Sequence, residues 1–163
     1  MVSEGGREGF IDTDGNYVIK LTDKVDYASF SDGYALIRKG NKWGFIDKKG
    51  NIVIKPAFYG AADFKEGFAS IMEKVGDKYL SGYINKKGKM ITKAIYEEVD
   101  DFQEGMACVK KNGKYGFINK KGKLVVNAIY DNAFLYENGL AYVAKGSNAY
   151  FIDKTGKKVI TIK

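Results

Sequence analysis

Acidic residues recur along the chain at a spacing that could place several carboxylates in one row. Asp32, Glu66 and Glu104 each precede a glycine and are separated by 34 and 38 residues. Two carboxylates that converge on one substrate can act as general acid and general base when their environments separate their pKa values. Each of these acids, however, holds the same place in a repeated phrase. We therefore interpret them as turn residues of different repeats and expect no catalytic residue.

Nucleophiles and metal ligands are scarce in the chain. Its 163 residues include no histidine, the commonest general base, and one cysteine, Cys108, which excludes an intrachain disulfide. Cys108 has no histidine to activate it as a nucleophile. The segment Asp12-Thr13-Asp14-Gly15-Asn16 resembles the start of a calcium loop, but Tyr17 and Asp23 stand where an EF-hand has its glycine and glutamate. We expect no metal, no cofactor and no enzymatic activity.

Lysine pairs form a candidate binding surface, because they recur once per repeat and would line up along one edge of a stack. The pairs are Lys48-Lys49, Lys86-Lys87 and Lys120-Lys121. With a net charge of +7, such a row could attract an anionic polymer, either nucleic acid or a cell-wall polyanion. Lysines in exposed turns also protect sheet edges and favour solubility. The chain has only two arginines for bidentate phosphate contacts, Arg7 and Arg38, so nucleic acid is not favoured.

The elements that carry these residues are set by an internal repeat. One phrase begins at residues 9, 44, 82, 116 and 150, so its copies are 35, 38, 34 and 34 residues apart. A period of this length is typical of solenoids, propellers and repeat arrays. The copies are Gly9-Phe10-Ile11-Asp12, Gly44-Phe45-Ile46-Asp47, Gly82-Tyr83-Ile84-Asn85, Gly116-Phe117-Ile118-Asn119 and Tyr150-Phe151-Ile152-Asp153.

A second phrase keeps step with the first and predicts strands on both sides of tight turns. It reads Phe30-Ser31-Asp32-Gly33, Phe64-Lys65-Glu66-Gly67, Phe102-Gln103-Glu104-Gly105 and Tyr136-Glu137-Asn138-Gly139. The alternating residues that follow it predict a strand. Asn112-Gly113 predicts a type I′ hairpin, and Asn119 to Gly122 predicts a turn into a third strand at Leu124-Val125-Val126. Each repeat is therefore expected to be a three-stranded antiparallel meander.

Two further features concern the joints between repeats. Phe58, Tyr96 and Tyr130 share one column six residues before the second phrase, and we expect them to pack between units; stacking on a carbohydrate is the alternative. The third copy of the repeat holds four extra residues near Gly76 to Ser81. We expect a longer hairpin there, whose Tyr79 and Leu80 are candidate partner-binding residues. The alternative is that this hairpin only folds back over its neighbour.

The segment Lys42-Trp43-Gly44-Phe45-Ile46-Asp47, followed by Gly50 and by Phe64-Lys65-Glu66-Gly67-Phe68-Ala69, resembles the WG-containing repeat family of bacterial proteins. The resemblance extends from about Glu8 to Lys163. The tryptophan is kept only at Trp43, since Ser81 and Tyr115 hold the equivalent positions. The resemblance implies an all-β repeat protein with a binding or scaffolding role and implies no catalytic residue.

The repeats are expected to form one domain over residues 1–163. We predict a half-repeat at about 8–29 that lacks its first strand, and full repeats at about 30–63, 64–101, 102–135 and 136–163. Three strands alone are marginal in water, so the units must stack. An open, twisted, solenoid-like array is favoured, and a small β-propeller is the alternative. The function that fits is a non-enzymatic scaffold for a protein or polymeric ligand, with no membrane-spanning segment.

Overall fold

The computed structural model describes residues 2–4, 7–11, 14–15, 17–21, 26–27 and 30–162. Asp12, Thr13 and Asn16 of the calcium-loop candidate lie outside these residues. The described residues form strands and turns without a helix, so they include no helix that is long and apolar enough to cross a membrane. The predicted all-β class is confirmed.

The first sheet contains β1 (Val2–Glu4), β2 (Arg7–Ile11) and β3 (Tyr17–Leu21) in that order. β1 pairs with β2 antiparallel, with Val2 opposite Gly9. The expectation that the N-terminal unit lacks its first strand is therefore wrong. The strand is only three residues long, too short for the alternating pattern that revealed the others.

Four sheets of four strands follow, which we call units 1 to 4, and each is an antiparallel meander. Unit 1 contains β4 (Asp26–Tyr27), β5 (Tyr34–Lys39), β6 (Lys42–Asp47) and β7 (Ile52–Phe58). Unit 2 contains β8 (Gly60–Ala61), β9 (Phe68–Val75), β10 (Lys78–Asn85) and β11 (Met90–Tyr96). Unit 3 contains β12 (Glu98–Val99), β13 (Met106–Lys111), β14 (Lys114–Asn119) and β15 (Leu124–Tyr130). Unit 4 contains β16 (Asn132–Ala133), β17 (Leu140–Lys145), β18 (Asn148–Asp153) and β19 (Lys158–Ile162).

The three long strands of each unit are those expected from the sequence, and the first strand, of two residues, was not predicted. β8 illustrates it: Gly60 pairs with Met72 and Ala61 with Ile71 on β9. A strand this short carries no periodic signal, and it lies in the joint between repeats, where no strand was expected. The short strand starts each sheet a few residues before the second phrase.

The turns have the backbone angles and side-chain hydrogen bonds that the sequence predicts. Asn112 and Gly113 both have positive φ, 52° and 73°, as a type I′ hairpin turn requires. At the start of the next turn, Asn119 Oδ1 accepts hydrogen bonds from the backbone N–H groups of Lys121 and Lys123 at 3.0 and 3.1 Å. An Asx side chain therefore organises the turn between the second and third long strands.

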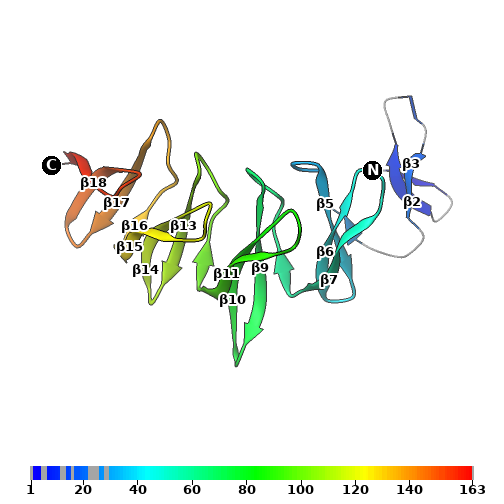
Figure 1. The fold of residues 1–163 in the computed structure, drawn as a ribbon, viewed down its shortest axis with the longest axis horizontal. Coiled ribbons are helices and arrows are strands. Elements are labelled where there is room, and N and C mark those ends of the chain that lie inside the picture. The colour runs from blue at the N-terminus through cyan, green and yellow to red at the C-terminus, as the bar shows by residue number, and fades with distance from the viewer. Residues whose placement is uncertain are drawn as a thin grey trace.

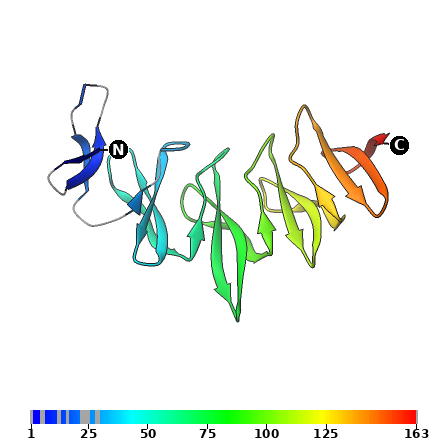
Figure 2. The same ribbon diagram turned by 180° about the vertical axis from the view of Figure 1, so that it is seen from behind.

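The units line up one after another in an open row (Figure 1), and the view from behind shows the same arrangement (Figure 2). Among the described residues, no strand of the last sheet pairs with a strand of the first. A closed propeller would need such a contact. The structure therefore has the favoured open array.

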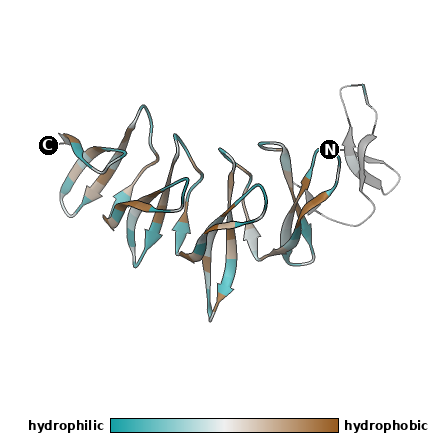
Figure 3. Cartoon of the chain, viewed as in Figure 1, coloured by the Kyte–Doolittle hydropathy of each residue, from teal (hydrophilic) through white to brown (hydrophobic). Residues whose placement is uncertain are grey.

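The core lies between successive units, because each unit is one sheet thick. Along the strands, apolar segments alternate with hydrophilic ones, and hydrophilic segments also lie in the turns (Figure 3). One buried cluster joins Leu36, Phe45 and Ile54 of unit 1 to Phe64 and Ile71 of unit 2. Stacking thus supplies the shared core that a single meander cannot form.

Aromatic residues of the predicted joint column pack inside this core. Tyr96 and Tyr130 are buried, and Phe58 is half-buried against the cluster of units 1 and 2. The packing interpretation of this column is confirmed, and burial leaves the rings of Tyr96 and Tyr130 unavailable for stacking on a carbohydrate.

Candidate binding surfaces

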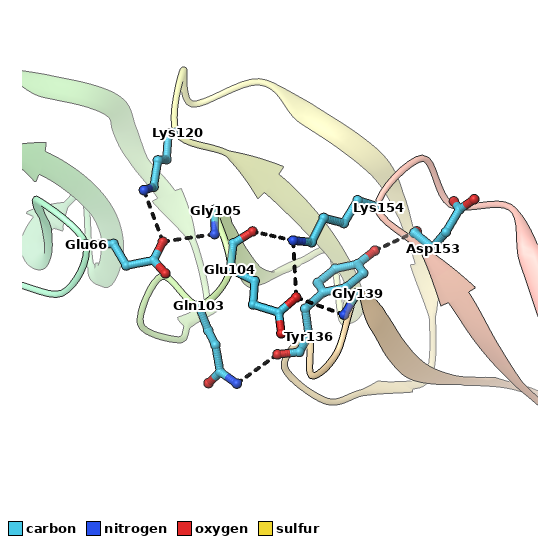
Figure 4. A network of polar contacts seen from close by, with 9 residues as sticks. All are labelled: Glu66, Gln103, Glu104, Gly105, Lys120, Tyr136, Gly139, Asp153 and Lys154. Atoms are coloured by element: carbon cyan, nitrogen blue, oxygen red, sulfur yellow. Dashed lines mark hydrogen bonds and ion pairs between the residues drawn. The ribbon is translucent and has the colours of Figure 1, made fainter.

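Neighbouring units are tied together by a carboxylate that reaches from one unit to the next. Glu66 Oε2 in unit 2 accepts a hydrogen bond from the Gly105 N–H of unit 3 at 2.9 Å and lies 3.2 Å from Lys120 Nζ (Figure 4). Glu104 Oε2 makes the equivalent contacts with Gly139 N–H at 2.9 Å and Lys154 Nζ at 3.2 Å in unit 4. We call this arrangement the acid clamp.

The same clamp joins units 1 and 2. Asp32 accepts a hydrogen bond from the Gly67 N–H at 2.7 Å and pairs with Lys86 Nζ at 2.9 Å. The Lys86 ammonium and the Gly67 N–H hold the pKa of Asp32 below its usual value. The acids of the second phrase are therefore structural ties between units, in addition to the turn residues that the sequence suggested.

Clamp acids occupy an unusual backbone conformation. Asp32, Glu66 and Glu104 have φ values of 52°, 49° and 52°, in the left-handed region where asparagine and glycine are common and glutamate is not. Asn138, with φ 52°, holds the same position in unit 4. For Glu66 and Glu104, the contacts with the next unit offset the free-energy cost of this left-handed backbone conformation.

The clamp divides the predicted lysine row into two kinds of residue. Lys86 and Lys120 pair with clamp acids, so part of their charge is neutralised. The second lysine of each pair extends into solvent, as does the first lysine of the first pair. These exposed lysines are Lys48, Lys49, Lys87 and Lys121. These ion pairs make the predicted lysine row a weaker positive surface than the sequence suggests.

A shallow groove of about 600 Å³ brings four lysines together at the junction of units 2 and 3. Phe68 and Ile91 supply apolar surface within it. The lysines are Lys86, Lys87, Lys89 and Lys120.

The insertion forms a longer hairpin, as expected. β9 and β10 have eight residues each, against six in the equivalent strands of the other units, and their hairpin projects beyond its neighbours (Figure 1). The Tyr79 side chain is 52% exposed, and Leu80 is half-buried. The hairpin thus presents Tyr79 to solvent more than Leu80.

Tyr79 belongs to an exposed aromatic surface. Its ring packs edge-on against Tyr59, with the centroids 5.3 Å apart, and Lys42 Nζ lies 3.1 Å from the centroid of the Tyr59 ring. Met72, 37% exposed, accepts a backbone hydrogen bond from Tyr59 N–H through its carbonyl oxygen at 2.9 Å. We call Lys42, Tyr59, Met72 and Tyr79 the Tyr59–Tyr79 patch.

Sequence reasoning missed Tyr59, although its column contained a signal. The equivalent residues of units 3 and 4 are acids that accept a hydrogen bond from the glycine of their own hairpin turn, Glu97 from Gly113 at 2.9 Å and Asp131 from Gly146 at 2.7 Å. In unit 2 the longer hairpin moves its turn glycine outward. Tyrosine replaces the acid there, and its ring packs on the hairpin.

A groove of about 390 Å³ adjoins the patch at Met72. Gly60, Ala61 and Ser70 give it small side chains, and Glu97 of the next unit adds a carboxylate. The patch and the groove together form a surface with aromatic, apolar and acidic parts on one side of units 2 and 3.

The comparison with protein families decides which repeat this is. The profile of the WG containing repeat matches residues 9–43, 43–79, 82–115 and 115–148. The chain belongs to this family. Its WG repeats also resemble a solved structure, a protein of unknown function from Bacteroides caccae, with 15% sequence identity and a TM-score of 0.39. That match covers 92% of this chain, and the chain spans 66% of the length of that protein. The comparison with curated proteins gives no match.

The glycine of the WG dipeptide has a steric role in this chain. A Cβ on Gly44 would lie 2.4 Å from the Ile54 carbonyl oxygen, and one on Gly116 would lie 2.5 Å from that of Val126. The third long strand passes over this glycine with a shift in register, between the pairs Trp43↔Phe58 and Phe45↔Ile54 in unit 1. Glycine leaves room for the third long strand to bulge just before its joint aromatic, Phe58 in unit 1.

Three observations concern candidate metal ligands, nucleophiles and acids in the described part of the chain. No group of three or more histidine, cysteine, aspartate or glutamate side chains there could hold a metal ion. Cys108 is buried, and burial raises the pKa of its thiol to about 12, which disfavours the reactive thiolate. The clamp carboxylates have lowered pKa values, because neighbouring ammonium and backbone N–H groups stabilise their ionised form.

Proposed function

We propose that this WG repeat protein is a non-enzymatic interaction module that binds a protein or polymeric ligand through the Tyr59–Tyr79 patch. The observation that carries the proposal is the exposed aromatic pair at the hairpin that holds the four extra residues. Tyr59 and Tyr79 are 37% and 52% exposed. Tyrosine is enriched in binding interfaces because its ring buries a large area and its hydroxyl remains able to hydrogen-bond.

The surroundings of the patch favour binding because they hold it in one shape. Its residues come from β6, from the joint before β8 and from β9 and β10, so the patch bridges units 1 and 2. The Asp32 clamp joins the same two units. A surface already fixed in its bound form loses less conformational entropy on association.

The experiment replaces Tyr79 with a photo-crosslinking benzophenone amino acid in the full-length protein, expressed in the cells from which the gene comes. Benzophenone inserts into C–H bonds of proteins and glycans alike. The matched control carries the same residue at Asn148, an exposed position in the equivalent hairpin of unit 4. We expect discrete adducts at position 79 that are absent at position 148. No adduct at position 79, or the same adducts at both positions, contradicts the proposal.

A second candidate function is electrostatic binding of an anionic polymer through the lysine row. The lysine-lined groove at Lys87 and Lys89 and the net charge of +7 favour it. The ion pairs of Lys86 and Lys120 weigh against it, because these charges already have partners.

Salt dependence separates this function from the first one. Binding to heparin and to a labelled single-stranded DNA is measured at increasing salt concentration, which should weaken it steeply if lysine contacts carry it. The variant reverses the exposed row to glutamate at Lys48, Lys49, Lys87 and Lys121. The control reverses four exposed lysines outside the row, Lys55, Lys78, Lys93 and Lys145, and has the same net charge. Loss of binding only in the first variant supports the lysine row, and equal loss in both variants contradicts it.

A further inference from the structure

The chain contains two Asn-Gly dipeptides, and both occupy tight turns. Asn112-Gly113 joins β13 to β14, and Asn138-Gly139 lies in the second phrase of unit 4, before β17. The two asparagines have φ values of 52°, and the glycines that follow them have φ values of 73° and 81°. Both asparagine residues are exposed to solvent.

In each dipeptide the glycine N–H is held by a glutamate carboxylate from elsewhere in the chain. Glu97 Oε2 accepts a hydrogen bond from the Gly113 N–H, and Glu104 Oε2 accepts one from the Gly139 N–H, both at 2.9 Å. The glutamates precede their glycines by 16 and 35 residues, so both contacts depend on the fold. The contact of Gly139 belongs to the acid clamp between units 3 and 4.

An Asn-Gly sequence can deamidate without an enzyme, because glycine has no Cβ to obstruct attack by its own nitrogen. At Asn138, the Gly139 nitrogen loses its proton to hydroxide and forms a bond to Asn138 Cγ. The Cγ–Nδ2 bond breaks, and the side-chain nitrogen leaves as ammonia after taking a proton from water. The cyclic imide that results takes up one water molecule and opens at either carbonyl, which gives aspartate or isoaspartate.

The contacts of Gly139 oppose the first step of this reaction. Removal of its amide proton would leave an anion next to the Glu104 carboxylate, and like charges repel. That carboxylate is too weak a base to take the proton itself, since the Gly139 N–H holds the pKa of Glu104 below its usual value. Backbone hydrogen bonds between Glu137 and Leu140, at 2.8 and 3.1 Å, fix the turn and resist the rotation that brings the nitrogen to Asn138 Cγ.

We propose that Glu97 and Glu104 protect the two Asn-Gly dipeptides from deamidation, and that Asn138 becomes a site of this modification when the clamp between units 3 and 4 opens. The rate at Asn138 then follows the fraction of molecules in which the Gly139 N–H is free of Glu104, because deamidation is slow relative to local opening.

Modification of Asn138 keeps the clamp open. Isoaspartate adds one carbon to the main chain before Gly139, which moves the Gly139 N–H away from Glu104. Either product also adds a negative charge beside the Glu104 carboxylate. Opening of this clamp is therefore recorded as a permanent change in the covalent structure.

Two crossed substitutions in the full chain test the proposal. Wild type, Glu97→Gln and Glu104→Gln are incubated at mildly alkaline pH, and peptide mass spectrometry follows the formation of aspartate and isoaspartate. Glu104→Gln should speed deamidation of Asn138 about fivefold and leave Asn112 unchanged, because glutamine is a neutral and therefore weaker acceptor for the Gly139 N–H. Glu97→Gln should have the reverse effect.

The second dipeptide is the folding control in each variant, because unfolding of the whole chain exposes both and would speed both reactions. Wild type in guanidinium chloride gives the unprotected rates, which should exceed the native rates at both dipeptides. Asn148 is a matched exposed asparagine followed by alanine, and it should stay unmodified.

Equal rates in native and denatured wild type overturn the proposal. A glutamine variant whose own dipeptide reacts no faster than in wild type overturns it as well. Equal acceleration of both dipeptides in each variant has the same meaning, because it assigns the effect to global unfolding.

Discussion

The Glu66 carboxylate accepts a hydrogen bond from the Gly105 N–H, 39 residues further along the chain, at 2.9 Å. The two residues hold adjacent positions in successive copies of the second phrase, so the phrase of one repeat contacts the phrase of the next repeat. Three such clamps join units 1 to 4 in the described structure. The acids that most resemble catalytic residues in the sequence are the ties that set the geometry of the array.

Substitution of Glu66 should separate the two parts of the clamp. Glu66→Gln keeps an oxygen acceptor for the Gly105 N–H but loses the Lys120 ion pair, and we expect the free energy of unfolding to fall by about 0.2–1 kcal/mol. Glu66→Met loses both interactions and should cost roughly a further 1 kcal/mol. Urea unfolding measures both changes. Glu73→Met, outside the clamps, is the control, and equal stability of all three variants and the wild type contradicts the clamp.

The clamps should make stability depend on acid pH. The pKa values of Asp32, Glu66 and Glu104 are below their usual values. Burial opposes this shift at Glu66, but the Gly105 and Lys120 contacts outweigh it. Such carboxylates stabilise the fold above the unfolded-state pKa of about 4, and the stabilisation is lost as the pH falls through the lower folded-state pKa.

Thermal melting from neutral pH to about pH 3 measures this dependence. We expect the Tm to fall below about pH 4.5 and to fall less steeply in Glu66→Gln. Burial raises the pKa of Asp100 and Asp101, which makes them act in the opposite direction, so the comparison of wild type with the single variant isolates Glu66. Parallel curves for the two proteins contradict the prediction.

Substitution of two adjacent lysines by methionine should have different effects on the free energy of unfolding. Lys86→Met removes an ion pair with Asp32 and should lower the free energy of unfolding by up to about 1 kcal/mol, as surface ion pairs do. Lys87→Met alters an exposed side chain and should have almost no effect. Urea unfolding of both variants provides the measurement. A larger loss at Lys87 than at Lys86 would show that the clamp is not the reason for the lysine column.

Gly116, which holds the position of the WG glycine in unit 3, should not tolerate even a methyl group. Gly116→Ala would place its Cβ 2.5 Å from the Val126 carbonyl oxygen, and we expect a cost of about 1–3 kcal/mol or more. Gly60→Ala is a milder comparison, because its Cβ would meet the Met72 side chain at 3.2 Å. Calorimetric Tm values rank the two variants, and a smaller decrease for Gly116→Ala than for Gly60→Ala refutes the steric explanation.

The sequence predicted the long strands and the turns because each occurs several times in the same column. It did not predict the partners of the clamp acids, since Glu66 and Gly105 meet only after two sheets have stacked. The strand β1 was too short to show a pattern. Tyr59 could have been noticed in the sequence, because it is aromatic in a column that holds the acids Glu97 and Asp131 in units 3 and 4. Its exposure depends on the longer hairpin and was not predictable from composition.

Small-angle X-ray scattering tests most directly whether the clamped repeats form an open, rigid array. Units arranged in an open row predict the scattering of an elongated particle. The elongated form should become more flexible when Asp32, Glu66 and Glu104 are all changed to glutamine. Scattering from a compact, ring-shaped particle would contradict the open array.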